Sequence, residues 1–169
     1  MSHTTPSLPQ LNSKVFLSDG GLETCLVFHE GFDLPYFAAF HLLKDDSGVD
    51  AMKRYFTKHM DVASRHGAGF VLESPTWRAS SGWGQKMGYT EAEIAEANRK
   101  AIAMLSTLRD EFDDGTIDIV ISGCVGPRGD GYVVSDAMTA AEAEAYHAPQ
   151  IAALKDGGAD LRSSPTLAG

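Results

Sequence analysis

Residues 50–72, DAMKRYFTKHMDVASRHGAGFVL, join a helix pattern directly to a strand pattern. Apolar side chains recur at helical spacing through residues 50–65, at Met52, Tyr55, Phe56, Met60 and Ala63. Gly67 stands where a glycine often ends a helix. The apolar run 69–72 that follows is typical of a buried strand. This stretch therefore predicts a long helix that leads at once into a strand.

The same alternation continues on both sides of this stretch. Residues 15–17 form an apolar run that ends in Ser18-Asp19-Gly20-Gly21, which predicts a buried strand followed by a turn with relaxed backbone limits. Further along, Thr90 and Glu93 form a capping box, and the apolar face of a second long helix follows. Residues 117–122 are rich in β-branched side chains and predict a third strand.

The last third of the chain repeats the pattern and then departs from it. Thr139 and Glu142 form another capping box, which opens a helix that two glycines close at residues 157–158. Residues 159–161 look like the start of a fourth strand. We expect the following residues not to continue it, because Pro165 cannot sit in a central strand.

Alternating strands and helices of these lengths predict right-handed parallel βαβ units, with the chemistry on the loops that follow the strands. A closed (β/α)8 barrel takes about 250 residues. The 169 residues would supply three units and the beginning of a fourth, so either a doubly wound sheet or a truncated barrel fits. We expect a flexible lead-in over 1–13, one domain over 14–161 and an atypical tail over 162–169.

Composition excludes several classes of protein. Fourteen Lys and Arg against 23 Asp and Glu give a net charge of −9, which repels nucleic acids and anionic membrane surfaces. The apolar runs are too short for a membrane span, and the first residues do not resemble a secretory signal. We therefore expect a cytoplasmic protein with its two cysteines, Cys25 and Cys124, reduced.

Two of the strand-end loops have the composition of binding loops. In residues 19–24 the glycines let the backbone approach a small ligand, and a carboxylate can receive an ammonium group; a plain glycine turn explains the residues equally well. Residues 73–80 place an acid, hydroxyl groups, Trp77 and a cation after the second strand. Packing against a helix is the simpler role for Trp77 alone.

The third loop, residues 123–132, has glycines at a spacing that does not match the dinucleotide-binding fingerprint. It predicts a wall that a substrate approaches closely, with Arg128 available for a carboxylate or simply solvated. Cys124 is expected to be a small buried residue, because no other Cys or His lies near it in the sequence. The six histidines follow no metal-binding spacing, and we assign no metal ligand.

Several motifs, in this order along residues 15–161, resemble the homocysteine S-methyltransferase family. They are Asp19-Gly20-Gly21-Leu22-Glu23-Thr24, Leu34-Pro35-Tyr36-Phe37-Ala38-Ala39-Phe40, Pro75-Thr76-Trp77-Arg78-Ala79-Ser80, Gly123-Cys124-Val125-Gly126-Pro127, Tyr146-His147-Ala148-Pro149-Gln150-Ile151 and Gly158-Ala159-Asp160-Leu161. The resemblance implies an α/β fold of the (β/α)8 TIM-barrel type, here incomplete, with about the first three to four βα units.

The resemblance also implies a reaction and a binding site. The family moves a methyl group from a donor such as S-methylmethionine or S-adenosylmethionine to the thiol of homocysteine, giving methionine, with zinc as cofactor. It implies that Asp19, Gly20 and Gly21 hold the amino-acid part of homocysteine, with Glu23 in the same substrate-binding loop. Thr76 and Trp77 would line the pocket near the donor.

The chain departs from the family where the metal should be held. The family's zinc-binding cysteines lie in Gly-Asn-Cys and Gly-Gly-Cys-Cys motifs, and neither occurs in this sequence. We therefore expect this chain to be inactive by itself. The alternative is a non-enzymatic half-barrel that pairs its open sheet edges, for example as a homo-oligomer. An unrelated α/β binding or hydrolytic domain is less consistent with the sequence, which has no GxSxG elbow and no P-loop lysine pattern.

Overall fold

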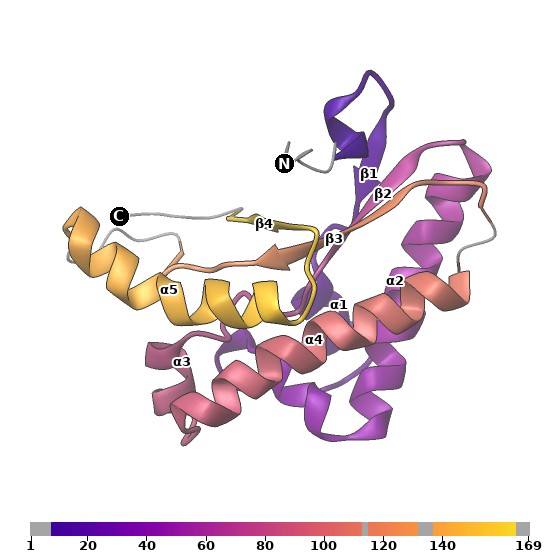
Figure 1. The fold of residues 1–169 in the computed structure, drawn as a ribbon. Coiled ribbons are helices and arrows are strands. Elements are labelled where there is room, and N and C mark those ends of the chain that lie inside the picture. Colours follow the sequence, from indigo (N-terminus) through magenta and orange to yellow (C-terminus); the bar gives the residue numbers. More distant parts are fainter. Residues whose placement is uncertain (1–7, 113–114, 132–136, 165–169) are drawn as a thin grey trace.

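A single parallel sheet organises the chain (Figure 1). The computed structural model describes residues 8–112, 115–131 and 137–164. The strands, hydrogen-bonded in the order β1-β2-β3-β4, are β1 (Phe16–Ser18), β2 (Gly69–Glu73), β3 (Ile119–Cys124) and β4 (Leu161–Ser163). The α-helices are α1 (Leu22–Phe28), α2 (Asp46–Arg65), α3 (Ser81–Lys86), α4 (Glu91–Phe112) and α5 (Ala140–Asp156), with short 3-10 turns at Pro9–Leu11, Pro35–Phe37 and Ala39–Lys44.

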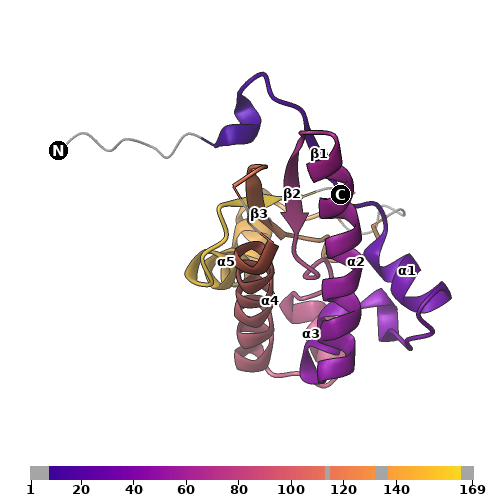
Figure 2. The same ribbon diagram turned by 90° about the vertical axis from the view of Figure 1, so that its right-hand side faces the viewer.

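The strand order and the placement of the helices decide between the two expected folds. Each strand pairs with the next one along the chain, whereas a doubly wound sheet reverses its strand order at a switch point. Helices α2, α4 and α5 lie on one side of the sheet, and no described helix covers the other side (Figures 1 and 2). Sequential order with one-sided helices is the arrangement of a barrel wall.

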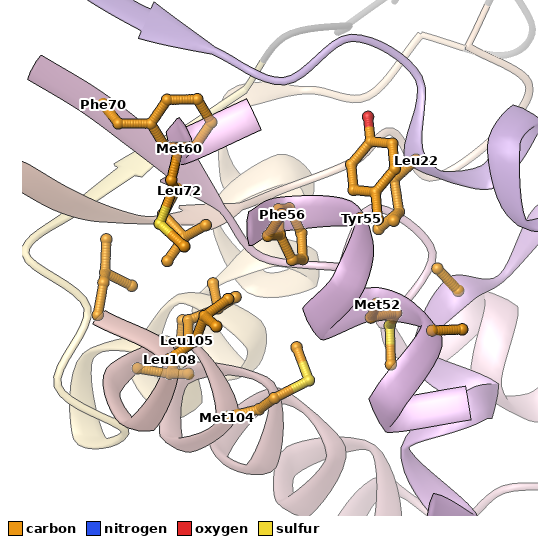
Figure 3. Close-up of a cluster of buried hydrophobic side chains, with 14 of the residues drawn as sticks. Leu22, Met52, Tyr55, Phe56, Met60, Phe70, Leu72, Met104, Leu105 and Leu108 are labelled. Atoms are coloured by element: carbon orange, nitrogen blue, oxygen red, sulfur yellow. The ribbon is translucent and has the colours of Figure 1, made fainter. Parts of the chain in front are cut away.

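The main hydrophobic core fills the space between the sheet and the long helices α2 and α4 (Figure 3). Phe70 and Leu72 of β2 point into it and are fully buried. They meet Phe56 and Met60 of α2 and Leu105 of α4, all of which belong to the same cluster. The apolar stripe that the sequence shows between residues 50 and 65 therefore belongs to a helix, as predicted, and this stripe lies against the sheet.

The predicted helix ends are confirmed at two capping boxes. Glu93 accepts hydrogen bonds from the Thr90 backbone and hydroxyl at 2.8 Å, and the Thr139–Glu142 pair has the same geometry. Helix α2 begins four residues earlier than the apolar pattern does, because the Asp45 side chain accepts the Gly48 N–H at 2.9 Å and caps it. None of the described helices is both long and apolar enough to cross a bilayer.

The expected end of the fourth strand is wrong. Arg162 and Ser163 continue it, pairing with Gly123 and Cys124 of β3. The Ser163 hydroxyl faces a polar side of the sheet and donates to Glu73, so this polar residue has a partner within the sheet. Pro165 lies outside the described residues.

Candidate functional site

A cavity of about 910 Å³ opens over the uncovered face of the sheet, at the carboxyl ends of β1, β2 and β3. Its walls come from the loops that follow these strands and from residues 36–37. Its polar and aromatic lining includes Asp19, Glu23, Tyr36, Phe37, Glu73, Trp77, Arg78, Trp83 and Cys124. Parallel α/β proteins bind their ligands at this edge of the sheet.

Asp19 lies directly after β1, and helix α2 holds its carboxylate. The Tyr55 hydroxyl donates to Asp19 Oδ2 at 2.9 Å. Burial raises the pKa of Asp19, and the hydrogen bond from Tyr55 and the nearby His59 oppose this rise. Burial also raises the pKa of Tyr55, and the Asp19 carboxylate adds to this effect, so the phenol stays a donor. A cationic ligand group would stabilise the ionised carboxylate.

Gly21 and Glu23 turn the chain from β1 into helix α1. Gly21 has a φ of 104°, a left-handed conformation that confirms the predicted turn with relaxed backbone limits. Glu23 follows in the first turn of α1 and faces the cavity. Burial is the main cause that raises the pKa of Glu23, and the Asp19 charge adds to it. The carboxyl groups of Asp19 and Glu23 thus lie in the same poorly solvated part of the cavity.

Glu73, at the end of β2, supplies a third carboxylate and is held from across the sheet. Ser163 Oγ of β4 donates to Glu73 Oε1 at 2.7 Å, and Ser122 Oγ of β3 donates to Ser163 Oγ at 2.9 Å. Cys124 lies beside this group and is buried, as expected from the sequence. Burial and the Glu73 charge raise the pKa of the Cys124 thiol, which therefore stays protonated near neutral pH.

The loop after β2 is built from buried polar groups. Thr76 is fully buried, and its hydroxyl donates to the Cys124 carbonyl at 2.7 Å and pairs with Ser74 Oγ at 2.6 Å. Gln150 of α5 donates to the Thr76 carbonyl at 2.8 Å. These bonds fix the loop against β3 and α5, so that its next residues have a defined direction.

The next two residues of that loop form an aromatic and cationic wall. The guanidinium carbon of Arg78 lies 3.9 Å from the ring centroid of Trp77 and 3.8 Å from that of Trp83. Contact of the cation with both indole rings restricts its position. The Trp83 Nε1–H donates to the Pro127 carbonyl at 3.1 Å, which ties this wall to the loop after β3.

Tyr36 and Phe37 complete the wall in an unusual backbone conformation. Their φ angles are 56° and 58°, which lie in the left-handed region that residues other than glycine rarely adopt. Both rings are exposed and line the cavity, and the Tyr36 ring lies 5.8 Å from the Trp83 ring. Strained residues of this kind concentrate at ligand-binding sites.

Four of the six residues predicted to bind substrate lie together on the cavity wall, namely Asp19, Gly21, Glu23 and Trp77. Gly20 and Thr76 are not among the lining residues, and Thr76 supports the wall from behind. Arg128, the cation that the sequence offered for a carboxylate, is also not among them. The sequence alone did not predict a role for Tyr55, Arg78 or Ser163 in this site. Arg78 is the cation that the sequence places in the loop of residues 73–80.

The described residues do not fit the zinc ion that the family resemblance implies. No three His, Cys, Asp or Glu side chains in residues 8–112, 115–131 and 137–164 are arranged to hold a metal ion. Zinc binds the thiolate form of cysteine, whereas burial and neighbouring carboxylates favour the protonated thiol of Cys124. These described residues therefore do not form a zinc site by themselves.

Fold and cavity define this chain as part of an α/β barrel with a cavity at the carboxyl ends of its strands. Comparison with protein families gives a match to homocysteine S-methyltransferase over residues 16–167. The chain belongs to this family. A search of curated protein sequences gives no match.

Two solved structures confirm the barrel fold. The metallated form of the homocysteine methyltransferase MmuM from Escherichia coli superposes with a TM-score of 0.72 at 17% identity, over 92% of this chain and 55% of that chain. Its oxidized form gives 0.70 at 18% identity, over 89% and 52%. The chain thus spans about half the length of these structures, and its sheet corresponds to an incomplete (β/α)8 barrel.

Proposed function

We propose that this chain forms the part of a homocysteine S-methyltransferase that binds the amino acid homocysteine and a sulfonium methyl donor. The observation that carries the proposal is that carboxylates and aromatic rings line the same cavity. Asp19, Glu23 and Glu73 lie on its wall together with the aromatic rings of residues 36–37 and of Trp77. Carboxylates suit the ammonium group of an amino acid, and aromatic faces attract a sulfonium cation.

In the proposed reaction, a lone pair on the homocysteine sulfur attacks the methyl carbon of S-methylmethionine or S-adenosylmethionine. The new S–CH3 bond forms as the sulfonium S–CH3 bond breaks, and its electron pair stays on the donor sulfur. The thiol proton passes to solvent, and methionine is the product. The chain's contribution is to hold the two sulfur atoms in line with the methyl group, which lowers the entropic part of the barrier.

For this chain alone we propose binding without turnover. The homocysteine thiol must lose its proton, and in the family a bound zinc ion favours this loss by lowering the thiol pKa. The Gly-Asn-Cys and Gly-Gly-Cys-Cys motifs are absent from the sequence, and the described cavity residues do not replace them.

Calorimetric titration of the chain with L-homocysteine tests the proposal. Asp19→Asn should weaken binding by about tenfold, because it removes one charge-assisted hydrogen bond. Asp50→Asn, which changes an exposed carboxylate on α2, is the matched control and should bind like the unmodified chain. Equal binding by the two variants, or no binding by the unmodified chain, would refute the proposed site. Methionine formation should be followed in parallel with each donor.

The two open edges of the sheet favour a second candidate function, a non-enzymatic interaction module. Strands β1 and β4 are edge strands, and edge strands readily pair with another chain. This candidate predicts a cytoplasmic homo-oligomer that forms without metal or ligand. Sedimentation equilibrium, together with the calorimetric titration, distinguishes the two candidates. A monomer that binds homocysteine supports the first candidate, and an oligomer that does not bind homocysteine supports the second.

A further inference from the structure

Arg78 lies on the wall of the cavity but is only 7% exposed. Its guanidinium contacts the ring faces of both Trp77 and Trp83, and Nη1 donates to the Gly129 carbonyl at 2.9 Å. A guanidinium carries five N–H donors in a planar fork. One of these N–H groups, on Nη1, therefore fixes the guanidinium to the loop after β3, while the two indole rings restrict its orientation.

The surrounding loops hold this stack firmly. A Cβ atom on Gly126 would overlap the backbone of Trp77, and one on Gly131 would come within 3.0 Å of the Trp77 ring. Trp77 is therefore pressed closely against the loop that carries Gly129. A cation that is already fixed loses little conformational entropy when it binds a ligand, which favours tight and selective binding.

The charge of the cavity gives this cation a specific use. Among the described residues that line the cavity, Arg78 is the one Lys or Arg, and Asp19, Glu23, Glu73 and Asp130 supply carboxylates. Arg78 is close enough to Glu23 to lower its pKa, although burial dominates and raises it. Positive and negative groups on one wall are complementary to a zwitterion, which carries an ammonium and a carboxylate on the same carbon.

We propose that Arg78 is the residue that binds the α-carboxylate of an amino-acid ligand and so determines the specificity of the cavity. The proposal rests on the proposed function, since homocysteine and S-methylmethionine both carry this carboxylate. A guanidinium fork matches a carboxylate with two parallel hydrogen bonds. Arg78 thereby selects amino acids over thiols and sulfonium ions that lack the acid group.

The test removes the carboxylate from the ligand and the guanidinium from the protein in turn. At pH 7, calorimetry would compare L-homocysteine with 3-aminopropane-1-thiol, and S-methylmethionine with (3-aminopropyl)dimethylsulfonium. In at least one pair, the unmodified chain should prefer the ligand with the carboxylate by about 10- to 100-fold. The pair that shows the preference identifies which ligand Arg78 binds.

Arg78→Met should reduce that preference to less than about threefold and leave the affinity for the ligand without the carboxylate unchanged. Arg78→Lys should keep an intermediate preference, because it retains the charge without the fork. Arg128→Met is the matched control, since Arg128 is not among the lining residues, and it should keep the full preference. Circular dichroism would confirm that each variant is folded.

Two results would overturn the role of Arg78. One is an unmodified chain that binds both members of each pair equally well. The other is a folded Arg78→Met variant that loses affinity for both members by the same factor, which would show that Arg78 acts only through the shape of the loops. Failure of the unmodified chain to bind either homocysteine or S-methylmethionine is a different result and refutes the proposed function itself.

Discussion

The two faces of the sheet differ sharply, although the same strands build both. Phe70, Leu72 and Ile121 point toward the helices, and each is fully buried in an apolar cluster. On the opposite face, Glu73 and Ser163 are joined by hydrogen bonds that span three strands. Side chains of a strand alternate between its faces, so neighbouring residues belong to different environments.

This difference separates stability from recognition. Apolar burial is non-directional and scales with the area removed from water, so the helix side can stabilise the fold with many combinations of side chains. Hydrogen bonds need fixed partners and directions, so the polar side is sensitive to individual atoms. We therefore expect changes on the helix side to act on unfolding, and changes on the cavity side to act mainly on binding.

The largest expected effect is on the helix side. Phe70→Ala should lower the free energy of unfolding by about 3–5 kcal/mol, because it removes a fully buried ring and leaves a cavity. The matched control is Val71→Ala, which changes the next residue on the opposite, partly exposed face and should cost less than about 1.5 kcal/mol. Urea unfolding curves measure both. Equal losses would mean that the two faces contribute alike.

A close contact between two cavity loops should give the next largest effect. Gly126→Ala would place a methyl group against the Trp77 carbonyl, so one loop must move, at a cost of about 1–3 kcal/mol in unfolding free energy. Gly20→Ala is the control, because a Cβ there would have no neighbour within 4 Å. Thermal unfolding and tryptophan fluorescence would follow the change. A Gly126→Ala variant as stable as the Gly20→Ala variant would contradict the packing described for Trp77.

The sequence predicted the first three strands and the long helices of this fold well, and it missed the short helices. Helices α2, α4 and α5 have either several turns of apolar period or a capping box, and both signals are local. Helices α1 and α3 have seven and six residues, too few to show a period, and neither was predicted. The strand order and the one-sided placement of the helices depend on packing between distant segments, so neither could be deduced from local patterns.

The site divides in the same way. Asp19, Gly21, Glu23 and Trp77 follow strands directly, and loops after parallel strands converge on one edge of the sheet. The contacts that orient them join residues far apart in sequence. Tyr55 is 36 residues from Asp19, and Ser163 is 90 residues from Glu73. No local pattern pairs such residues, and Tyr55 is also one of the apolar positions of its helix.

A smaller effect should appear in the pH dependence of homocysteine binding. The ammonium group binds ionised Asp19, so affinity should fall as the pH is lowered through the raised pKa of this residue and level off at about the tenfold loss expected for Asp19→Asn. Tyr55→Phe removes a hydrogen bond that favours the ionised form, so it should move the midpoint to higher pH. Calorimetry over a pH series measures both midpoints. A midpoint that Tyr55→Phe leaves unchanged would show that Asp19 does not control binding.

The smallest effect concerns the hydrogen bond between the side chains of β2 and β4. Strands β2 and β4 are separated by β3, and the Glu73 side chain reaches Ser163 over the small side chain of Ser122. Ser163→Ala should lower the unfolding free energy by about 1 kcal/mol, because a half-buried carboxylate loses a donor to both of its oxygens. Ser164→Ala is the matched control, since it removes an exposed hydroxyl that donates only to the Val125 carbonyl and should cost less. A greater loss for Ser163 would mean that the polar face helps to hold β4 in the sheet, so recognition and stability overlap there. Equal losses would mean that the bond from Ser163 to Glu73 adds nothing to the stability of β4, and the separation between the two faces would then hold there too.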